Sequence, residues 1–258
     1  MKNVKISEIF KDEELAYAVA LELNVEIDAP ISAQKLKEIK CLSWDRYERD
    51  CGCDGDDDCN YCTEIQSIQG VEYLTGLSEL KLQINDVNDL TPLANLTNLL
   101  ALDFFSGQIT DLSPLKNLTN LKYLNFSCNE IKDLSPLSEL KDLICLQVTS
   151  NQITDLSPLK NLTNLEELNL CYNQITDLSP LKNLTNLKYL NVKNNQISDL
   201  SSISELTNLL GFDCRNNPID AEVASQLMRK AYDRYLEISG YTPKIRNPPP
   251  IQTNRLVY

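Results

Sequence analysis

A 22-residue pattern occurs seven times in succession without insertion or deletion, and it restricts the folds open to this 258-residue chain. The copies begin at Ile65, Val87, Ile109, Ile131, Ile153, Ile175 and Ile197. Repetition at a fixed period of this length is typical of a solenoid, in which each repeat packs only against its neighbours. We therefore expect residues 65–218 to form one elongated stack, with residues 1–64 and 219–258 capping its ends.

Each repeat combines a short strand with a tight return of the chain. The pattern L-x-x-L-x-L from Leu165 places alternate side chains on the inner face of a strand. Asn173 follows where the chain must turn, and its amide can satisfy backbone groups there. We read Ser179 as a helix N-cap and Pro180 as the first helical residue, which predicts a short 3₁₀ or α turn on the outer side.

The asparagine position recurs in nearly every repeat, so the inward amides are expected to stack as a ladder. Its members are Asn85, Gly107, Asn129, Asn151, Asn173, Asn195 and Asn217, and only Gly107 breaks the series. Cys214 occupies an inward strand position of the last repeat, so we expect it to be a small buried hydrophobic residue.

The motif L-x-x-L-x-L-x-x-N at 22-residue spacing, followed by I-x-D-L-S-P-L, closely resembles the internalin-type bacterial leucine-rich repeats. The upstream segments ISEIFKDEELAYAVALELNV and ISAQKLKEI resemble the helical N-terminal cap of that family. The resemblance covers residues 6–218. It implies an α/β solenoid, a right-handed leucine-rich-repeat arc with a helical N-cap, that binds proteins on its concave face. The stretch AEVASQLMRKAYDRYLEIS repeats Val223, Leu227, Ala231 and Tyr235 at helical spacing, which predicts a C-terminal capping helix followed by an extended tail.

The net charge and the distribution of apolar residues indicate which kinds of partner and which cellular compartment to expect. The net charge is −13 and the pI about 4.5, which disfavours nucleic-acid binding and is compatible either with a basic protein partner or with solubility alone. The first residues lack an apolar signal segment, and no apolar run reaches membrane-spanning length. We therefore expect no membrane association and a cytoplasmic location, although known internalins are exported.

Differences between the repeats indicate where a partner binds. The outer block ITDLSPLKNLTNL is identical at 109–121, 153–165 and 175–187, whereas the outward strand positions change in nearly every copy. Drift after duplication is the alternative explanation. Phe105 and Tyr123, in adjacent repeats, are expected to lie about 5 Å apart as an aromatic pair. The predicted protein-binding residues are Phe105, Tyr123, Asn125, Gln147, Glu167, Asn169, Tyr172, Tyr189, Asn191, Asp213 and Arg215.

An insertion of about 16 residues follows the predicted capping strand of Ile39, Leu42 and Trp44. Its spacing is C-x-C-x₅-C-x₂-C, formed by Cys51, Cys53, Cys59 and Cys62, in a cysteine-rich loop at residues 45–64. Four thiolates can close a tetrahedral zinc site, which is the cofactor we expect. Disulfides, an unliganded loop and a calcium site formed by the neighbouring aspartates are the alternatives.

Nothing in the sequence indicates catalysis. The chain has no histidine, which removes the commonest general base, and no glycine-rich phosphate loop. Cys145 and Cys171 are expected to be exposed thiols without an activating base. The sequence thus favours a non-enzymatic binding protein. It is either a cytoplasmic adaptor or immunity-type protein, an internalin-like secreted virulence factor that binds a host protein, or a structural or designed repeat scaffold.

Metal analysis tests the zinc prediction. Protein purified without added zinc should contain about one zinc ion per chain. A variant with serine at Cys51, Cys53, Cys59 and Cys62 should contain none, because serine does not supply a thiolate. Metal-free wild-type protein would contradict the prediction.

Overall fold

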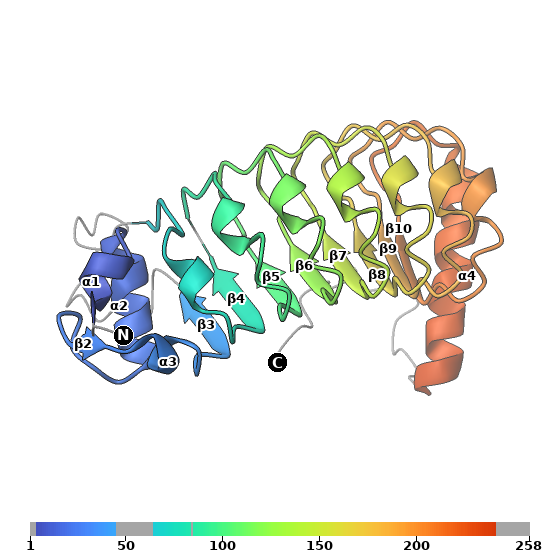
Figure 1. Cartoon of the computed structure of the whole chain (residues 1–258). Helices are drawn as coiled ribbons and strands as arrows, with labels where there is room; N and C mark the ends of the chain where they lie inside the picture. Colours follow the sequence, from blue (N-terminus) through green and yellow to red (C-terminus); the bar gives the residue numbers. More distant parts are fainter. Residues whose placement is uncertain (1–3, 45–63, 84, 241–258) are drawn as a thin grey trace, which may run out of the picture.

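The computed structural model describes residues 4–44, 64–83 and 85–240, which form a curved stack of coils (Figure 1). One face is an eight-stranded parallel sheet in which the strands follow their order along the chain. The strands are β3 (Cys41–Trp44), β4 (Glu79–Leu82), β5 (Ala101–Asp103), β6 (Tyr123–Asn125), β7 (Cys145–Gln147), β8 (Glu167–Asn169), β9 (Tyr189–Asn191) and β10 (Gly211–Asp213). Short 3₁₀ helices line the opposite, convex face at Val71–Tyr73, Thr91–Leu93, Ser113–Leu115, Ser135–Leu137, Ser157–Leu159, Ser179–Leu181 and Ser201–Ile203.

The register of the sheet confirms the predicted solenoid. Leu80 pairs with Leu102 and Leu102 with Leu124, so that each strand lies beside the residues 22 positions further along. The leucines and isoleucines of successive coils form one continuous core, nearly all of them under 5% exposed. Phe104 and Phe126 stack within it, with ring centroids 5.6 Å apart and ring planes 4° from parallel. No single coil can bury its own leucines, so the stack is stable only as a whole.

The convex turns are 3₁₀ helices as predicted, but the residue that caps them was misidentified. Ser179 is the first residue of its helix, and its backbone N–H and hydroxyl both donate to the Asp177 carboxylate, at 2.7 Å each. The aspartate two residues earlier therefore accepts the free N–H of the turn. A single 3₁₀ turn is too short for Ser179 to cap a later N–H, so the Asp of I-x-D-L-S-P performs that role.

The asparagine ladder is present and connects neighbouring coils. Asn151 donates through Nδ2 to the carbonyls of Phe126 at 2.9 Å and Val148 at 3.2 Å. Its Oδ1 accepts the backbone N–H of Ile131, one coil earlier, at 2.9 Å. The side chain is only 8% exposed, so these bonds form without competition from water. From Gly107 onward, the residue before each ladder position is left-handed, as at Ser150, where φ is 54°.

Gly107 interrupts this ladder, as the sequence predicts, and Asn85 compensates. Val87 would otherwise donate its N–H to a side chain at position 107. Instead it donates to Oδ1 of Asn85, two residues earlier in its own coil, at 3.0 Å. A Cβ on Gly107 would lie 3.0 Å from that oxygen and 2.9 Å from Oδ1 of Asn129. The glycine thus leaves the room that the changed orientation of Asn85 requires.

The N-terminal end of the stack is closed by a small helical cap, which confirms that expectation. The cap contains β1 (Val4–Lys5), α1 (Ile6–Ile9), α2 (Glu13–Glu22), β2 (Pro30–Ile31) and α3 (Ala33–Leu36), and β1 pairs antiparallel with β2. Asp12 caps α2 by accepting the Leu15 N–H at 3.0 Å. The other oxygen of Asp12 accepts the N–H groups of Gln66 and Ser67, at 2.8 and 3.2 Å. One carboxylate therefore joins the cap to the first repeat.

The C-terminal cap is α4 (Ala221–Ser239), which contacts β10 at the end of the arc, and its later turns project beyond the repeats (Figure 1). The predicted contact stripe was wrong at its first member, because Val223 is 48% exposed. Ala224, Leu227 and Met228 pack partly buried against the core, and Ala231 is 3% exposed. The stripe therefore begins at Ala224 and keeps the predicted Leu227 and Ala231. The domain boundaries at residues 64 and 218 stay predictions.

Replacing Asn151 by alanine tests the ladder. The change removes the partner of the buried Ile131 N–H and of two carbonyls, so the free energy of unfolding should fall by about 2–4 kcal/mol. Urea denaturation measures it. The matched control is Asn164→Ala on the exposed surface, where one bond to the Lys141 carbonyl is lost and the expected change is below about 1 kcal/mol. Equal losses in the two variants would contradict a special role for the ladder.

Candidate functional site

The seven strands β4 to β10 present three rows of outward side chains on the concave face, one residue per strand in each row. The first row is Glu79, Ala101, Tyr123, Cys145, Glu167, Tyr189 and Gly211. The second row is Lys81, Asp103, Asn125, Gln147, Asn169, Asn191 and Asp213. The third row follows the strands and is Gln83, Phe105, Ser127, Thr149, Cys171, Lys193 and Arg215. Neighbours in a row are one strand apart, at about 4.8 Å.

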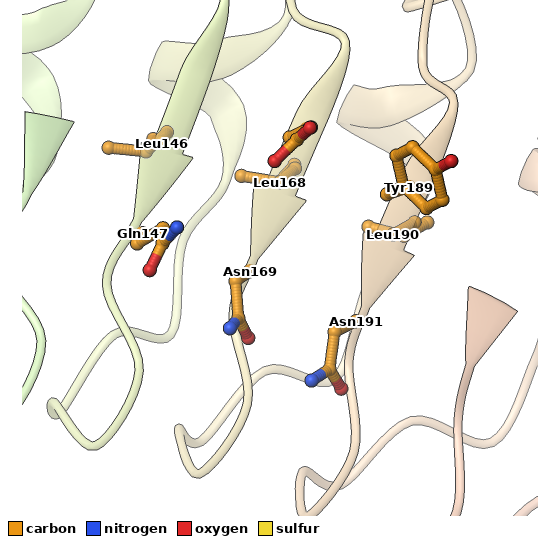
Figure 2. A pocket seen from close by; sticks show the side chains of 8 residues that line it. Leu146, Gln147, Leu168, Asn169, Tyr189, Leu190 and Asn191 are labelled. Carbon is orange, nitrogen blue, oxygen red and sulfur yellow. The ribbon is translucent and has the colours of Figure 1, made fainter. Parts of the chain in front are cut away.

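The asparagines of the second row are held in one orientation by their own backbone. Asn169 accepts the Cys171 N–H through Oδ1 at 3.2 Å, and Asn191 accepts the Lys193 N–H at 3.1 Å. With the oxygen occupied, the Nδ2 group of each is a donor, and within the described ranges neither has an acceptor. Figure 2 shows the two amides side by side on β8 and β9. Their orientation is therefore fixed, with the donor group of each free in the described part of the chain.

A shallow hollow lies on β7, β8 and β9 (Figure 2). Its lining residues are Leu146, Gln147, Glu167, Leu168, Asn169, Tyr189, Leu190 and Asn191. Glu167 and Tyr189 are paired in register across adjacent strands. The hollow therefore brings a carboxylate, an aromatic ring and two amide donors to one place. Five of the predicted binding residues meet there: Gln147, Glu167, Asn169, Tyr189 and Asn191.

Glu167 has an unusual electrostatic setting. Burial raises the pKa of its carboxyl, the nearby charge of Glu166 adds to that rise, and Lys188 opposes it. Lys188 is held by Glu166 at 2.6 Å, and the hydrogen bond that Glu167 accepts is from the Cys145 thiol at 3.8 Å. Within the described ranges Glu167 forms no ion pair. A desolvated charge without a counterion lowers the stability of the free protein.

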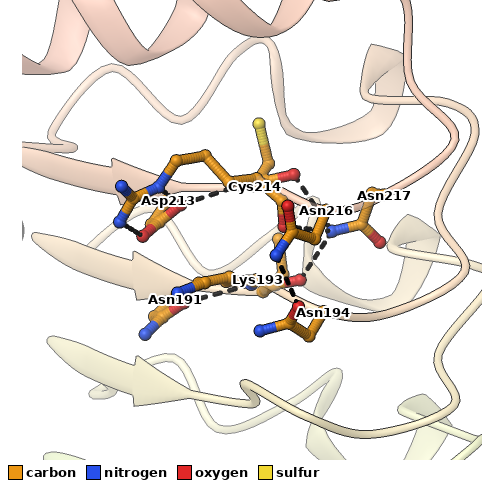
Figure 3. A network of polar contacts seen from close by, with 9 residues as sticks. Asn191, Lys193, Asn194, Asp213, Cys214, Asn216 and Asn217 are labelled. Carbon is orange, nitrogen blue, oxygen red and sulfur yellow. Dashed lines mark hydrogen bonds and ion pairs between the residues drawn. The ribbon is translucent and has the colours of Figure 1, made fainter.

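Asp213 and Arg215, at the C-terminal end of the face, are paired with each other (Figure 3). The guanidinium donates through Nε at 2.9 Å and Nη2 at 2.5 Å to a carboxylate that is only 4% exposed. Burial alone would raise the pKa of Asp213, but hydrogen bonds from the Arg215 side chain and backbone outweigh it and lower that pKa. These two residues form a satisfied pair beside α4.

The comparisons with known proteins agree with this architecture. A crystal structure of internalin C2 from Listeria monocytogenes is similar at 33% sequence identity and a TM-score of 0.65, over 83% of this chain and 97% of that one. The chain belongs to the internalin-type leucine-rich-repeat family. The family profile described as "Leucine Rich repeats (2 copies)" matches residues 97–139, 119–161, 141–183 and 163–205. A search of curated proteins by sequence finds no match.

Two further structures show how widely the fold is shared. A leucine-rich-repeat protein of Leptospira interrogans, LIC12759, has 21% identity and a TM-score of 0.60, over 78% of this chain and 61% of that one. A plant peptide hormone receptor, RGFR1 in complex with RGF2, has 26% identity and a TM-score of 0.53, over 58% of this chain and 26% of that one.

The internalin-type arc separates the aromatic residues that we expected to form a pair. Tyr123 lies opposite Ala101 in the register of β5 and β6, and Phe105 is four residues further along from Ala101. That offset is about 13 Å along the strand direction, so the predicted 5 Å pair was wrong. Phe105 is 36% exposed at the end of its strand, and Tyr172 is 54% exposed in a left-handed turn with φ 55°. Phe105 and Tyr172 each present a separate aromatic ring at one edge of the concave face.

The prediction of exposed thiols was also wrong. Cys145 is 2% exposed and Cys171 is 6% exposed, because larger neighbours in the same rows cover these short side chains. Burial raises the pKa of Cys145 to about 12, so its thiol stays protonated and is a poor nucleophile. Cys214, at 2% exposed, is the buried small residue that the sequence predicted.

The predicted metal ligands Cys51, Cys53, Cys59 and Cys62 lie outside the described residues, so the zinc site stays a prediction. Within the described ranges, no group of three or more His, Cys, Asp or Glu side chains is placed to hold a metal ion. In the same ranges, none of the helices has the length and apolar run that a bilayer crossing needs.

The unpaired charge in the hollow predicts an unusual stability effect. Glu167→Gln should raise the melting temperature at pH 7, because it removes a desolvated charge without breaking an ion pair. A carboxyl with a raised pKa in the folded state binds its proton more tightly when folded. The wild type therefore loses stability as the pH rises above the usual value of 4.5, and the advantage of the variant should vanish below it. Thermal unfolding between pH 3.5 and 7.5 measures both effects.

The matched control is Glu166→Gln, one residue away, which breaks the ion pair with Lys188. It should leave the melting temperature unchanged or lower it slightly, since half-exposed ion pairs contribute below about 1 kcal/mol. A lower melting temperature of Glu167→Gln at pH 7 would contradict the prediction, because it would show that the folded protein stabilises the Glu167 charge.

Proposed function

We propose that this internalin-type chain is a non-enzymatic protein-recognition module whose concave face binds a partner protein. The observation that carries the proposal is the contrast between the two faces. The convex block ITDLSPLKNLTNL is identical in three coils, at 109–121, 153–165 and 175–187, although convex residues such as Lys116, Lys160 and Lys182 are exposed. The concave rows change in almost every repeat and contain polar groups without a partner in the described ranges, together with exposed aromatic rings. A surface shaped by binding has these properties.

The chemistry of the face favours binding over catalysis. The described residues place Glu167 and Asp103 as separate carboxylates on different strands, without a paired acid or base at reaction distance. Burial raises the pKa of the Cys145 and Cys171 thiols on this face, so both hold their protons. The plant receptor with the related fold is in complex with a peptide hormone, RGF2, which illustrates that leucine-rich repeats serve as binding proteins.

Two biological settings fit this activity. The first is a cytoplasmic bacterial adaptor or immunity-type protein that captures a partner inside the cell. The second is an internalin-like virulence factor that engages a host protein, and the match along 97% of internalin C2 favours it. Fractionation of the native source separates them, because a virulence factor of the second kind accumulates in the culture medium or on the cell surface. A scaffold with no natural partner is the remaining reading.

Partner capture with two matched variants tests the proposal. A concave variant carries Phe105→Ala, Tyr123→Ala and Tyr172→Ala, and a convex variant carries Lys116→Ala, Lys160→Ala and Lys182→Ala. A partner captured by the wild type and identified by mass spectrometry should bind the concave variant at least about tenfold more weakly, since each aromatic anchor contributes about 2 kcal/mol. The convex variant should bind normally. Loss of binding in the convex variant alone would contradict the proposal, and circular dichroism checks that both variants are folded.

A further inference from the structure

The hollow on β7, β8 and β9 has a chemistry that selects one kind of side chain, and the argument rests on the proposed protein-binding function. Its floor is apolar, formed by Leu146, Leu168 and Leu190, which are at most 2% exposed. Its walls are polar and come from the first and second rows of the concave face. Figure 2 shows the Tyr189 ring on β9 close to Leu190, and the amides of Asn169 and Asn191 further along β8 and β9.

Glu167 is the charged group of this hollow and lacks a cation. The nearest ammonium, that of Lys188, is held by Glu166 at 2.6 Å. Of the other cations on the concave face, Lys81 binds Glu79 at 3.2 Å and Arg215 binds Asp213. Lys193 lies in the third row, four residues beyond the level of Glu167, which is about 13 Å along the strand direction. The half-buried carboxylate is therefore complementary to a positive charge brought by a partner, and the net charge of −13 attracts basic partners from a distance.

Tyr189 supplies a flat surface next to that carboxylate. It pairs with Glu167 on one side and with Gly211 on the other. Gly211 adds no side chain beside the ring, and Tyr235 of α4 lies near enough to act electrostatically on the Tyr189 hydroxyl. A cation over the face of a tyrosine ring within about 6 Å is attracted by the ring electrons.

The two amides extend the site along the second row. Asn169 and Asn191 each hold their oxygen on a backbone N–H and present Nδ2 as a donor. An amide NH₂ group does not bind a cation. It can bind the backbone carbonyls of the partner chain whose side chain carries the cation. The hollow thus combines an acceptor for a positive head group with donors for the flanking peptide.

We propose that this hollow is a binding site for an arginine side chain of the partner protein, with its guanidinium paired to Glu167 and lying against Tyr189, and with adjacent peptide carbonyls bonded to Asn169 and Asn191. Arginine fits better than lysine for two reasons. Its planar guanidinium can donate two parallel hydrogen bonds to a carboxylate and lie flat on a ring. It is also more weakly hydrated than an ammonium, which matters where the carboxylate is already half desolvated.

The test uses small probes on the full-length, ¹⁵N-labelled protein, followed by NMR. N-acetyl-arginine N-methylamide should shift the resonances of Glu167, Tyr189, Asn169 and Asn191 in a saturable way. The citrulline analogue, which has nearly the same shape without the charge, should bind at least about tenfold more weakly. The lysine analogue should bind more weakly than the arginine probe. Equal binding of lysine, or shifts spread evenly over the acidic surface, would overturn the proposal.

Two variants separate the site from general charge attraction. Glu167→Gln should weaken the arginine probe about tenfold or more, whereas Glu166→Gln, which removes the same charge one residue away, should leave it within about twofold. A dispersed spectrum confirms that each variant is folded. Unchanged affinity in Glu167→Gln would also overturn the proposal. The probes need no partner protein, so the two experiments can fail separately. Absence of probe binding would leave the partner-capture result intact, and absence of partner capture would leave the probe-binding result intact.

Discussion

The structure depends on the hydrogen bonds that connect one coil to the next through buried asparagine amides. Each coil reverses direction through a left-handed residue, which costs roughly 1–2 kcal/mol for a side chain other than glycine. The ladder amide compensates by satisfying carbonyls of two coils and an N–H of the preceding coil. The leucine core then packs between coils at a fixed distance. Because the distance between successive coils is constant, the strands form one continuous concave sheet and the 3₁₀ turns form one regular convex row.

The sequence predicted the features that depend on repetition. The solenoid, the inward leucines, the ladder with its break at Gly107 and the two helical caps follow from period and polarity, and the structure has them. The wrong predictions concern how deeply a side chain is buried and how far along its strand it lies. Cys145 occupies an outward position but is covered by larger side chains from adjacent strands. The sequence of one repeat does not show how large the side chains of the adjacent repeats are. The Phe105–Tyr123 pair failed because adjacency between repeats holds only at equal positions along the strands.

The candidate site was only partly visible in the sequence. Its residues could be assigned to the concave face from the repeat alone. Which of them meet, and which are already paired, depends on the fold. Asp213 and Arg215 satisfy each other, whereas Glu167 is left unpaired since Glu166 binds the nearest lysine. The desolvated charge of Glu167 has no counterion in the described part of the chain and lowers the stability of the free protein. Proteins retain such destabilising groups where the groups serve a function.

The ladder also has a direction along the chain. From Ile109 onward, the amide oxygen that accepts the N–H of the first residue of a coil lies 20 residues further along the chain, as in Asn129 for Ile109 and Asn151 for Ile131. During synthesis, each of these N–H groups can be paired in this way only after those 20 residues are made. The start of the stack is held differently, because Asp12 of the N-terminal cap accepts the Gln66 N–H and Asn85 accepts the Val87 N–H. The hydrogen bonds of the ladder therefore become available in the order in which the chain is synthesised.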